Sequence, residues 1–221
     1  MECLIPRVVI AATKSGSGKT TIVTGLLAAL KQKGVKVQPY KVGPDYIDPG
    51  YHRLASGQPS HNLDSWLMSM DTMVEVFANS ASKAELAVIE GVMGLYDGGR
   101  KGISSTAEIA KSLAAPVVLV LDCKSMGASA AALALGFKLY DKDVKLAGVI
   151  LNRLGSDNHE KIIRDALEEL DSHHHDCHHK CAECEAVNQI EQALLRLVWR
   201  DIPGNNKVDR DHHLNQPIQN K

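Results

Sequence analysis

The segment AATKSGSGKTT, residues 11–21, constrains the fold of this 221-residue chain more than any other feature. An apolar run at residues 6–13 precedes it and is typical of a buried strand, and TTIVTGLLAALKQKG follows with the periodicity of an amphipathic helix. A glycine-rich turn between such elements directs backbone N–H groups and the positive end of the helix dipole at a phosphate. The usual first glycine is replaced by Thr13, but the context disfavours a turn that binds nothing. We interpret the segment as a phosphate-binding loop.

The rest of the chain alternates between short apolar runs rich in Val and Ile and longer stretches of helical pattern. We predict further strands at residues 35–42, 85–91, 115–122 and 146–152, and helices near residues 105–113, 127–139 and 158–170. Continuous apolar strands that alternate with helices predict a parallel sheet covered on both faces. The expected fold class is α/β, a P-loop NTPase-type three-layer sandwich with a mainly parallel sheet. Residues 43–70 show no clear period, and we expect an irregular functional excursion there.

The composition excludes several classes of function. Lys and Arg total 25 against 26 Asp and Glu, so no basic field indicates nucleic acid or a membrane surface as a partner. The amino-terminal residues lack the pattern of a signal peptide, and no apolar run reaches the length of a membrane span. Five cysteines, an odd number, make a poor disulfide framework. These observations predict a soluble cytoplasmic protein.

A change of character divides the sequence near residue 171. We expect residues 1–170 to form the nucleotide- and substrate-binding domain, and residues 171–221 to hold the tract DSHHHDCHHKCAECE, one helix and a polar tail. Cys181 and Cys184 have the Cys-x-x-Cys spacing of a Zn²⁺ site, with Cys177 nearby. Since this pair has no second pair elsewhere, we favour non-specific metal binding by a tail over a structural zinc site.

The phosphate-binding loop supplies a lysine and a hydroxyl for the chemistry of a nucleotide. Lys19 is expected to meet the β- and γ-phosphates, and the Thr20 hydroxyl is expected to ligate Mg²⁺. Lys14 has two open interpretations, a second phosphate contact or a solvated loop lysine. The loop residues predicted to bind nucleotide are Lys14, Gly16, Ser17, Gly18, Lys19, Thr20 and Thr21.

A second lysine and several carboxylates follow predicted strands, where ligands of parallel sheets bind. Lys41 ends one strand with Asp45 and Asp48 close behind, Glu90 ends another, and Asp97 lies in a glycine-flanked loop. One such acid would usually only solvate the surface, but four beside a lysine and a phosphate loop indicate phosphoryl transfer with Mg²⁺. We predict Thr20, Asp45, Asp48 and Glu90 as metal ligands, and Lys19, Lys41 and Asp97 as catalytic residues.

Other polar positions have a structural interpretation beside the functional one. Asp64 is either a further site residue or the N-cap of a helix. Ser105 stands three residues before Glu108, which is the spacing of a capping box. Asn152 and Arg153 would read the nucleotide base or would simply end the last strand. The hydroxyl-bearing candidates for substrate binding are Tyr46, Ser104, Ser105 and Thr106.

Five longer motifs follow the phosphate loop in a characteristic order: KVGPDYIDPGYH, NLDSWLM, IEGVMGLYDG, STAEIAK and LAGVILNR. In this order they resemble the amino-terminal synthetase domain of the cobyrinic acid a,c-diamide synthase family, over residues 6–170. The loop KSGSGKTT also resembles the deviant phosphate loops of the dethiobiotin synthetase and partition-ATPase superfamily. In that superfamily the lysine that matches Lys14 contacts phosphate, often across a homodimer.

The family resemblance implies ATP- and Mg²⁺-dependent amidation of the a and c acetate side chains of cobyrinic acid or a related tetrapyrrole. Each carboxylate would be phosphorylated by ATP, and ammonia would displace the phosphate. The resemblance implies that Lys19 and Lys41 neutralise charge, that Thr20, Glu90 and one of the two preceding aspartates hold Mg²⁺, and that the loop around Asp97 faces the macrocycle.

One departure concerns the nitrogen donor. Family members carry a carboxyl-terminal class I glutaminase domain, and no Gly-x-Cys-x-Gly occurs in this sequence. The resemblance therefore implies free ammonia, a separate glutaminase subunit as partner, or a truncated, inactive chain. The alternatives are an enzyme that amidates nickel-sirohydrochlorin and a ParA-like switch that dimerises around ATP. Dethiobiotin synthesis fits the GPDYIDPGYH segment less well.

Overall fold

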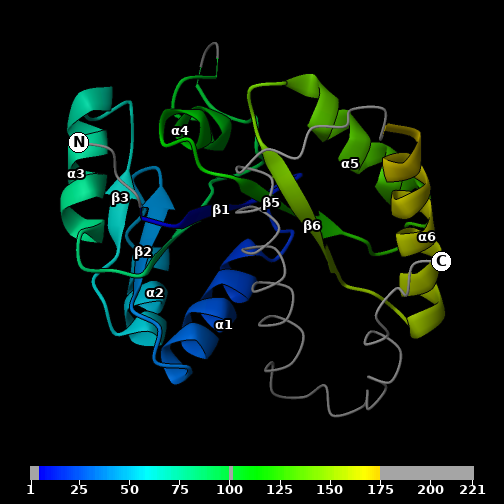
Figure 1. The fold of residues 1–221 in the computed structure, drawn as a ribbon, viewed down its shortest axis with the longest axis horizontal. Helices are drawn as coiled ribbons and strands as arrows, with labels where there is room; N and C mark the ends of the chain where they lie inside the picture. The colour runs from blue at the N-terminus through cyan, green and yellow to red at the C-terminus, as the bar shows by residue number, and fades with distance from the viewer. Residues whose placement is uncertain (1–4, 100–101, 175–221) are drawn as a thin grey trace, which may run out of the picture.

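The computed structural model describes residues 5–99 and 102–174, with side chains described as far as residue 169. The described chain alternates between strands and helices, as the sequence predicts, and forms an α/β sandwich (Figure 1). The elements in chain order are β1 (Arg7–Ala12), α1 (Lys19–Gln32), β2 (Val37–Val42), α2 (Asp48–Ser56), β3 (His61–Leu63), α3 (Met70–Ala81), β4 (Leu86–Glu90), α4 (Thr106–Ser112), β5 (Val117–Asp122), α5 (Ser129–Tyr140), β6 (Leu146–Asn152) and α6 (Asp157–His174).

The described strands form one sheet in the order β3-β2-β4-β1-β5-β6, and every pairing between them is parallel. The predicted fold class is confirmed. β1 lies in the middle, so the phosphate loop leaves the sheet between the ends of β4 and β5. In the register, Lys41 of β2 and Ile10 of β1 both pair with Glu90 of β4. The sheet thus places the ends of three strands side by side.

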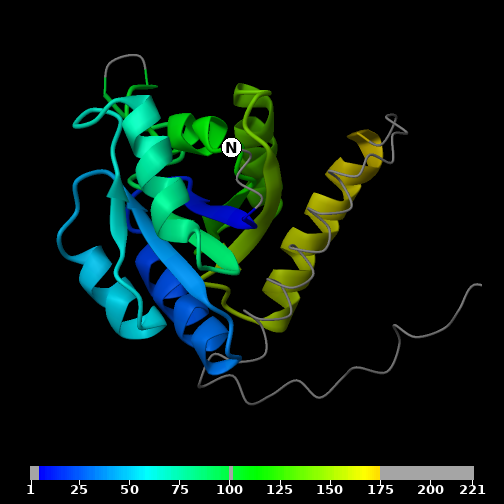
Figure 2. The same ribbon diagram turned by 60° about the vertical axis from the view of Figure 1, so that its left-hand side comes forward.

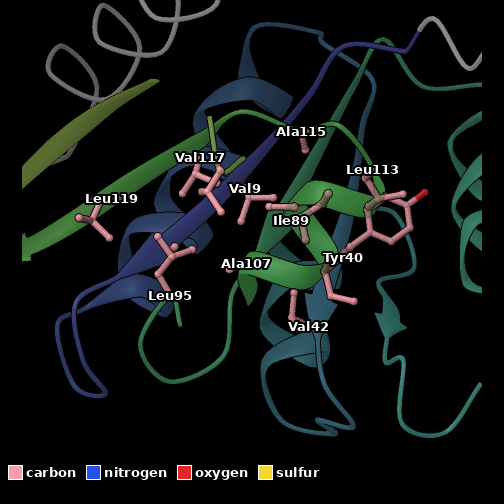
Figure 3. Packing of buried hydrophobic residues seen from close by; sticks show 14 of the residues in the cluster. Val9, Tyr40, Val42, Ile89, Leu95, Ala107, Leu113, Ala115, Val117 and Leu119 are labelled. Atoms are coloured by element: carbon pink, nitrogen blue, oxygen red, sulfur yellow. The ribbon is translucent and has the colours of Figure 1, made fainter. Parts of the chain in front are cut away.

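Two hydrophobic cores cover the two faces of the sheet. Successive residues of a strand point to opposite faces, and accordingly Val9 and Ala11 belong to one core while Val8 and Ile10 belong to the other. The first core packs against α3, α4, α5 and α6, and Figure 3 shows Val9 and Ile89 close to Ala107 of α4. The second packs against α1, and Figure 2 shows α1 and α2 side by side. Full burial of each such aliphatic side chain contributes roughly 1.5–3 kcal/mol.

The segment between β2 and α3 is more regular than the sequence indicates. Residues 43–70 contain the 9 residues of α2 and the 3 residues of β3, so the expected irregular excursion is wrong for these parts. α2 begins because Asp45 Oδ1 accepts hydrogen bonds from the backbone N–H groups of Ile47 and Asp48, at 2.8 and 3.1 Å. It ends at Gly57, whose φ of 76° is in the left-handed region. α3, capped by the Ser69 hydroxyl, is also absent from the predicted helices.

The carboxyl-terminal part of the sequence lies largely outside the described residues. α6 continues to His174, past the predicted boundary near residue 171, and the division into two regions stays a prediction. Cys177, Cys181 and Cys184, with the zinc site considered there, fall outside the part that the structure describes. No helix among the described residues combines the length and apolar character needed to cross a bilayer.

Candidate functional site

The phosphate loop joins the end of β1 to the start of α1 and depends on two glycines in left-handed conformations. Gly16 has φ 74° and Gly18, the N-cap of α1, has φ 96°. A Cβ atom on Gly18 would lie 2.4 Å from Asn152 Nδ2. Because left-handed φ values and this close approach both disfavour any side chain, the loop requires glycine here.

The end of β6 holds the loop from the other side. Asn152 Nδ2 donates to the Ser17 carbonyl at 2.8 Å, and Arg153 Nη2 donates to the Gly16 carbonyl at 2.9 Å. Arg153 Nη1 also pairs with Asp122 Oδ2 at 3.0 Å. Asn152 and Arg153 thus bind the backbone of the phosphate loop, a contact that the sequence did not indicate. Recognition of a base by Asn152 stays a prediction.

Lys14 has a partner within its own chain. Its side chain is 67% exposed, and its Nζ lies 3.6 Å from Asp122 Oδ2. This contact with the end of β5 was missed, although Asp122 closes a predicted strand at the same edge of the sheet. This contact does not decide between phosphate binding by Lys14 and a solvated Lys14 side chain.

A buried polar cluster lies directly beyond the start of α1. Thr20 Oγ1 donates to Glu90 Oε1 at 2.6 Å, and Lys41 Nζ donates to the same oxygen at 3.0 Å. Lys41 Nζ lies 2.7 Å from Asp48 Oδ2, and the same oxygen lies 3.3 Å from Thr20 Oγ1. The Glu90 side chain is fully buried, and that of Lys41 is nearly so. Four of the predicted residues thus form one connected cluster.

The charges of the cluster stabilise one another against the cost of burial. Burial alone would raise the pKa of Glu90, but the hydrogen bonds from His52 and Thr20 and the charge of Lys41 hold it below its ordinary value. Burial would lower the pKa of Lys41, yet the Glu90 and Asp48 carboxylates raise it. The site therefore holds an ionised carboxylate and an ammonium group together at neutral pH.

Lys19 lies at the mouth of this cluster. Its Nζ donates to the backbone carbonyl of Met93, a residue with a left-handed φ of 48° in the loop after β4. Burial, together with the nearby charge of Lys41, lowers the pKa of Lys19. In the same loop, Asp97 Oδ2 accepts from the backbone N–H of Gly94 at 2.9 Å. The loop of Asp97 therefore lies against the phosphate loop, as its place after β4 predicts.

The donor set fits Mg²⁺ bound together with a nucleotide. Thr20, Asp48 and Glu90 offer one hydroxyl and two carboxylates, the hard oxygen ligands that Mg²⁺ prefers. Mg²⁺ usually keeps waters and substrate phosphates as further ligands, so a site with few protein donors suits it. Within the described ranges, three or more His, Cys, Asp or Glu side chains nowhere gather into a metal-binding group.

The predicted residues that follow β2 lie in different surroundings. The Asp45 carboxylate accepts from the N–H groups of Ile47 and Asp48, whereas the Asp48 carboxylate contacts Thr20 and Lys41. Tyr46 is 90% exposed beside a hollow of about 450 Å³ at the end of β2. The residues that line this hollow are Val42, Gly43, Pro44, Asp45, Tyr46, Ile47 and Val92.

The hydroxyl-bearing candidates near α4 make mainly structural contacts. Ser105 is the N-cap of α4 and accepts from the Glu108 N–H at 3.1 Å, as a capping box predicts. Thr106 Oγ1 accepts from the Val92 N–H, and Ser104 Oγ donates to Asp64 Oδ1 at 2.7 Å. Ser69, and not Asp64, caps the next helix. Substrate binding by Ser104, Ser105 and Thr106 stays a prediction.

One buried residue of the cluster is missing from the sequence-based candidates. His52 Nε2 lies 2.6 Å from Glu90 Oε2, and the residue is fully buried. Its position four residues after Asp48 was a usable signal, because residues four apart lie on the same face of a helix. The signal was missed because α2 was not predicted.

The fold and the site define an α/β protein that binds a nucleotide through a phosphate loop. A family model described as the CobQ/CobB/MinD/ParA nucleotide binding domain matches residues 8–193, and the chain belongs to this family. The resemblance seen in the sequence motifs is thereby confirmed at the level of the family.

Curated relatives bear names that agree with the motifs. The chain is 55% identical over 169 residues to a cobyrinate a,c-diamide synthase of Dehalococcoides mccartyi, a match that covers 76% of this chain and 36% of the relative. It is 52% identical over 168 residues to a hydrogenobyrinate a,c-diamide synthase of Streptomyces coelicolor, covering 75% and 35%. The matched part thus spans little more than a third of each relative's length.

Among solved structures, chloroplast FtsY from Physcomitrella patens matches with a TM-score of 0.56 at 16% identity, covering 76% of this chain and 56% of that one. FtsY from Elizabethkingia anophelis matches with a TM-score of 0.51 at 18% identity, covering 74% and 55%. At such low identity these matches concern the fold alone.

Proposed function

We propose that this chain uses MgATP to activate and amidate the a and c carboxylates of cobyrinic acid or hydrogenobyrinic acid. The observation that supports the proposal most is the connection of Lys41 and Asp48, from β2 and α2, to Thr20 of the phosphate loop through Glu90. A plain nucleotide-binding loop needs no second buried lysine. A lysine at this place suits a reaction in which an anionic acceptor approaches a phosphate. The names of the relatives indicate the acceptor.

The proposed chemistry has two steps. A carboxylate oxygen of the substrate attacks the γ-phosphorus of ATP, ADP leaves, and the carboxyl becomes a mixed anhydride. Ammonia then adds to the acyl carbon, the C–O bond to phosphate breaks, and the nitrogen loses a proton to leave a neutral amide. Mg²⁺, when bound, would neutralise charge on the phosphates.

The residues of the chain would bind, orient and neutralise. Lys19 and Lys41 would supply positive charge to the transferred phosphoryl group, and both side chains are buried from water. Thr20, Asp48 and Glu90 would hold Mg²⁺. The hollow beside Tyr46, with exposed Ile47, offers an apolar surface for the macrocycle at the mouth of the same site. Asp97 lies in the loop after β4 whose Met93 carbonyl binds Lys19, and it is proposed to act at the acyl centre.

The test combines the purified chain with MgATP, ammonium chloride and either cobyrinic or hydrogenobyrinic acid. We expect ADP to form only with the macrocycle present, and mass spectrometry to show two successive exchanges of a hydroxyl for an amino group. Glu90→Gln should abolish both products because it removes a carboxylate from the metal site, while Lys111→Met on α4 should react as wild type.

Two outcomes would contradict different parts of the proposal, the first the role of Glu90 and the second the amidation itself. Undiminished amidation by Glu90→Gln would remove Glu90 from the metal site. ATP hydrolysis that ignores the macrocycle and responds to a protein partner would instead support the ParA-like switch.

A further inference from the structure

One helix sends two side chains into the buried cluster. Asp48 and His52 are four residues apart on the same face of α2, and Asp48 contacts Lys41 and Thr20 while His52 contacts Glu90 at the end of β4. Among the charged residues of the cluster, His52 contacts Glu90 alone. The His52 side chain is fully buried, so water does not compete for its ring nitrogens.

The two oxygens of Glu90 have different partners. Oε1 accepts from Thr20 at 2.6 Å and from Lys41 at 3.0 Å, while Oε2 meets His52 Nε2 at 2.6 Å. A carboxylate otherwise turns readily about its last torsion, because sp³–sp² torsions have broad preferences. The hydrogen bond to Oε2 therefore fixes the plane of the carboxylate and keeps its second oxygen facing the phosphate loop.

The ring of His52 is itself held in place. An ionised carboxylate can only accept, so His52 Nε2 carries the hydrogen of this bond. Nδ1 lies 3.1 Å from the Ser60 hydroxyl, which follows α2 in the chain. In the neutral ring the Ser60 hydroxyl donates to Nδ1, and this bond fixes the tautomer that Glu90 requires.

We propose that His52 is a positioning residue that holds the plane of the Glu90 carboxylate, so that the oxygen not bound by His52 stays directed at Thr20 and would stay directed at the Mg²⁺ that accompanies the nucleotide. The inference rests on the proposed function only as far as the binding of MgATP. It assigns no proton transfer to His52. A purely structural histidine would fill space and stabilise α2 but would leave the Mg²⁺ requirement unchanged.

The test measures the affinity of the full chain for a fluorescent ATP analogue as a function of Mg²⁺ concentration, with no macrocycle present. His52→Ala should need at least about ten times the Mg²⁺ concentration of the wild type to reach the same affinity. This is the usual effect of removing a residue that orients a metal ligand. Its affinity for the analogue in the presence of EDTA should equal that of the wild type.

Two further variants separate orientation from packing. The side-chain amide of His52→Gln reaches about as far as Nε2 and should restore a near-normal Mg²⁺ requirement. The shorter side chain of His52→Asn reaches only toward Ser60 and should behave like His52→Ala. His61→Gln is the matched control, because His61 on β3 is half-buried against Tyr40 and should leave the requirement unchanged.

The result expected is a large shift for His52→Ala and His52→Asn, and little for His52→Gln and His61→Gln. If circular dichroism shows that His52→Ala does not fold, the Mg²⁺ requirements of His52→Gln and His52→Asn are compared instead. The inference would be overturned by an unchanged Mg²⁺ requirement in a folded His52→Ala variant. It would also be overturned by equal Mg²⁺ requirements of His52→Gln and His52→Asn. Since no macrocycle is used, a chain that fails to amidate would contradict the proposed function and still test His52.

Discussion

Lys41 and Lys111 form ion pairs of the same length in different surroundings. Lys41 Nζ lies 2.7 Å from Asp48 Oδ2, and Lys111 Nζ lies 2.7 Å from Asp141 Oδ2. The Lys41 side chain is 5% exposed and that of Lys111 is 38% exposed. Burial makes charged partners costly to separate, because a carboxylate that loses its cation stays desolvated.

Replacement of Lys41 should therefore destabilise the chain far more than replacement of Lys111. Lys41→Met leaves Glu90 and Asp48 close together without their shared cation, and we expect a loss of about 3 kcal/mol or more in the free energy of unfolding. Lys111→Met removes a solvent-screened pair and should cost less than about 1 kcal/mol. Urea unfolding without nucleotide measures both values, and equal losses would show that the cluster is not the buried network described above.

At the scale of elements, the sequence predicts strands better than helices. Five of the six strands follow from apolar runs, because a central parallel strand is buried on both faces and tolerates few polar residues. β3 is three residues long, too short for a pattern. α2 was missed because Tyr51 and Leu54 are exposed on it while His52 is buried, the reverse of the usual amphipathic order.

The same reasoning explains which site residues could be predicted. Thr20, Lys41 and Glu90 follow from strand and loop ends, since the parallel register brings such ends together. The contact of His52 with Glu90, and those of Asn152 and Arg153 with the phosphate loop, depend on side-chain directions in elements far apart in the sequence. The spacing of Asp48 and His52 is a local signal only once α2 is recognised, and no local pattern encodes the contacts of Asn152 and Arg153 with the phosphate loop.

Two glycines of the first βα unit should respond in opposite ways to alanine. Gly18→Ala introduces a Cβ that would lie 2.4 Å from Asn152 Nδ2 at a φ of 96°, so the loop must shift and nucleotide affinity should be lost. Gly25 lies on the exposed side of α1 with nothing within 4 Å of an added Cβ. Gly25→Ala should stabilise the helix by about 0.5–1 kcal/mol and leave affinity unchanged.

Binding of a fluorescent ATP analogue and thermal unfolding, measured on both variants, test this prediction. Normal affinity in Gly18→Ala would mean that the contact between Asn152 and the loop is not required for binding.

For the molecule as a whole, buried charge is concentrated at the carboxyl ends of the strands, and two apolar cores cover the faces of the sheet. The polar side chains buried there include Lys19, Lys41, His52 and Glu90, which meet at the ends of β2 and β4 and the start of α1. The apolar clusters lie beneath them and supply most of the stability. Folding therefore depends on pH in part through this cluster, because a charge whose environment changes on folding links stability to protonation.

The acid side of the stability profile should depend on Glu90. Its pKa in the folded chain is held below the ordinary value of 4.5, so the unfolded chain binds more protons in the interval between the two values. The resulting stabilisation is complete above the ordinary pKa, and it is lost as the pH falls through the pKa of the folded state.

The free energy of unfolding of the wild type should therefore exceed that of Glu90→Gln at neutral pH, and the difference should shrink steadily below the ordinary pKa. Denaturant unfolding at a series of pH values measures it, with Glu75→Gln on the exposed side of α3 as a control whose curve should parallel the wild type. A Glu90→Gln curve parallel to the wild type would mean that Glu90 has the same proton affinity folded and unfolded, and the cluster would then not hold it ionised.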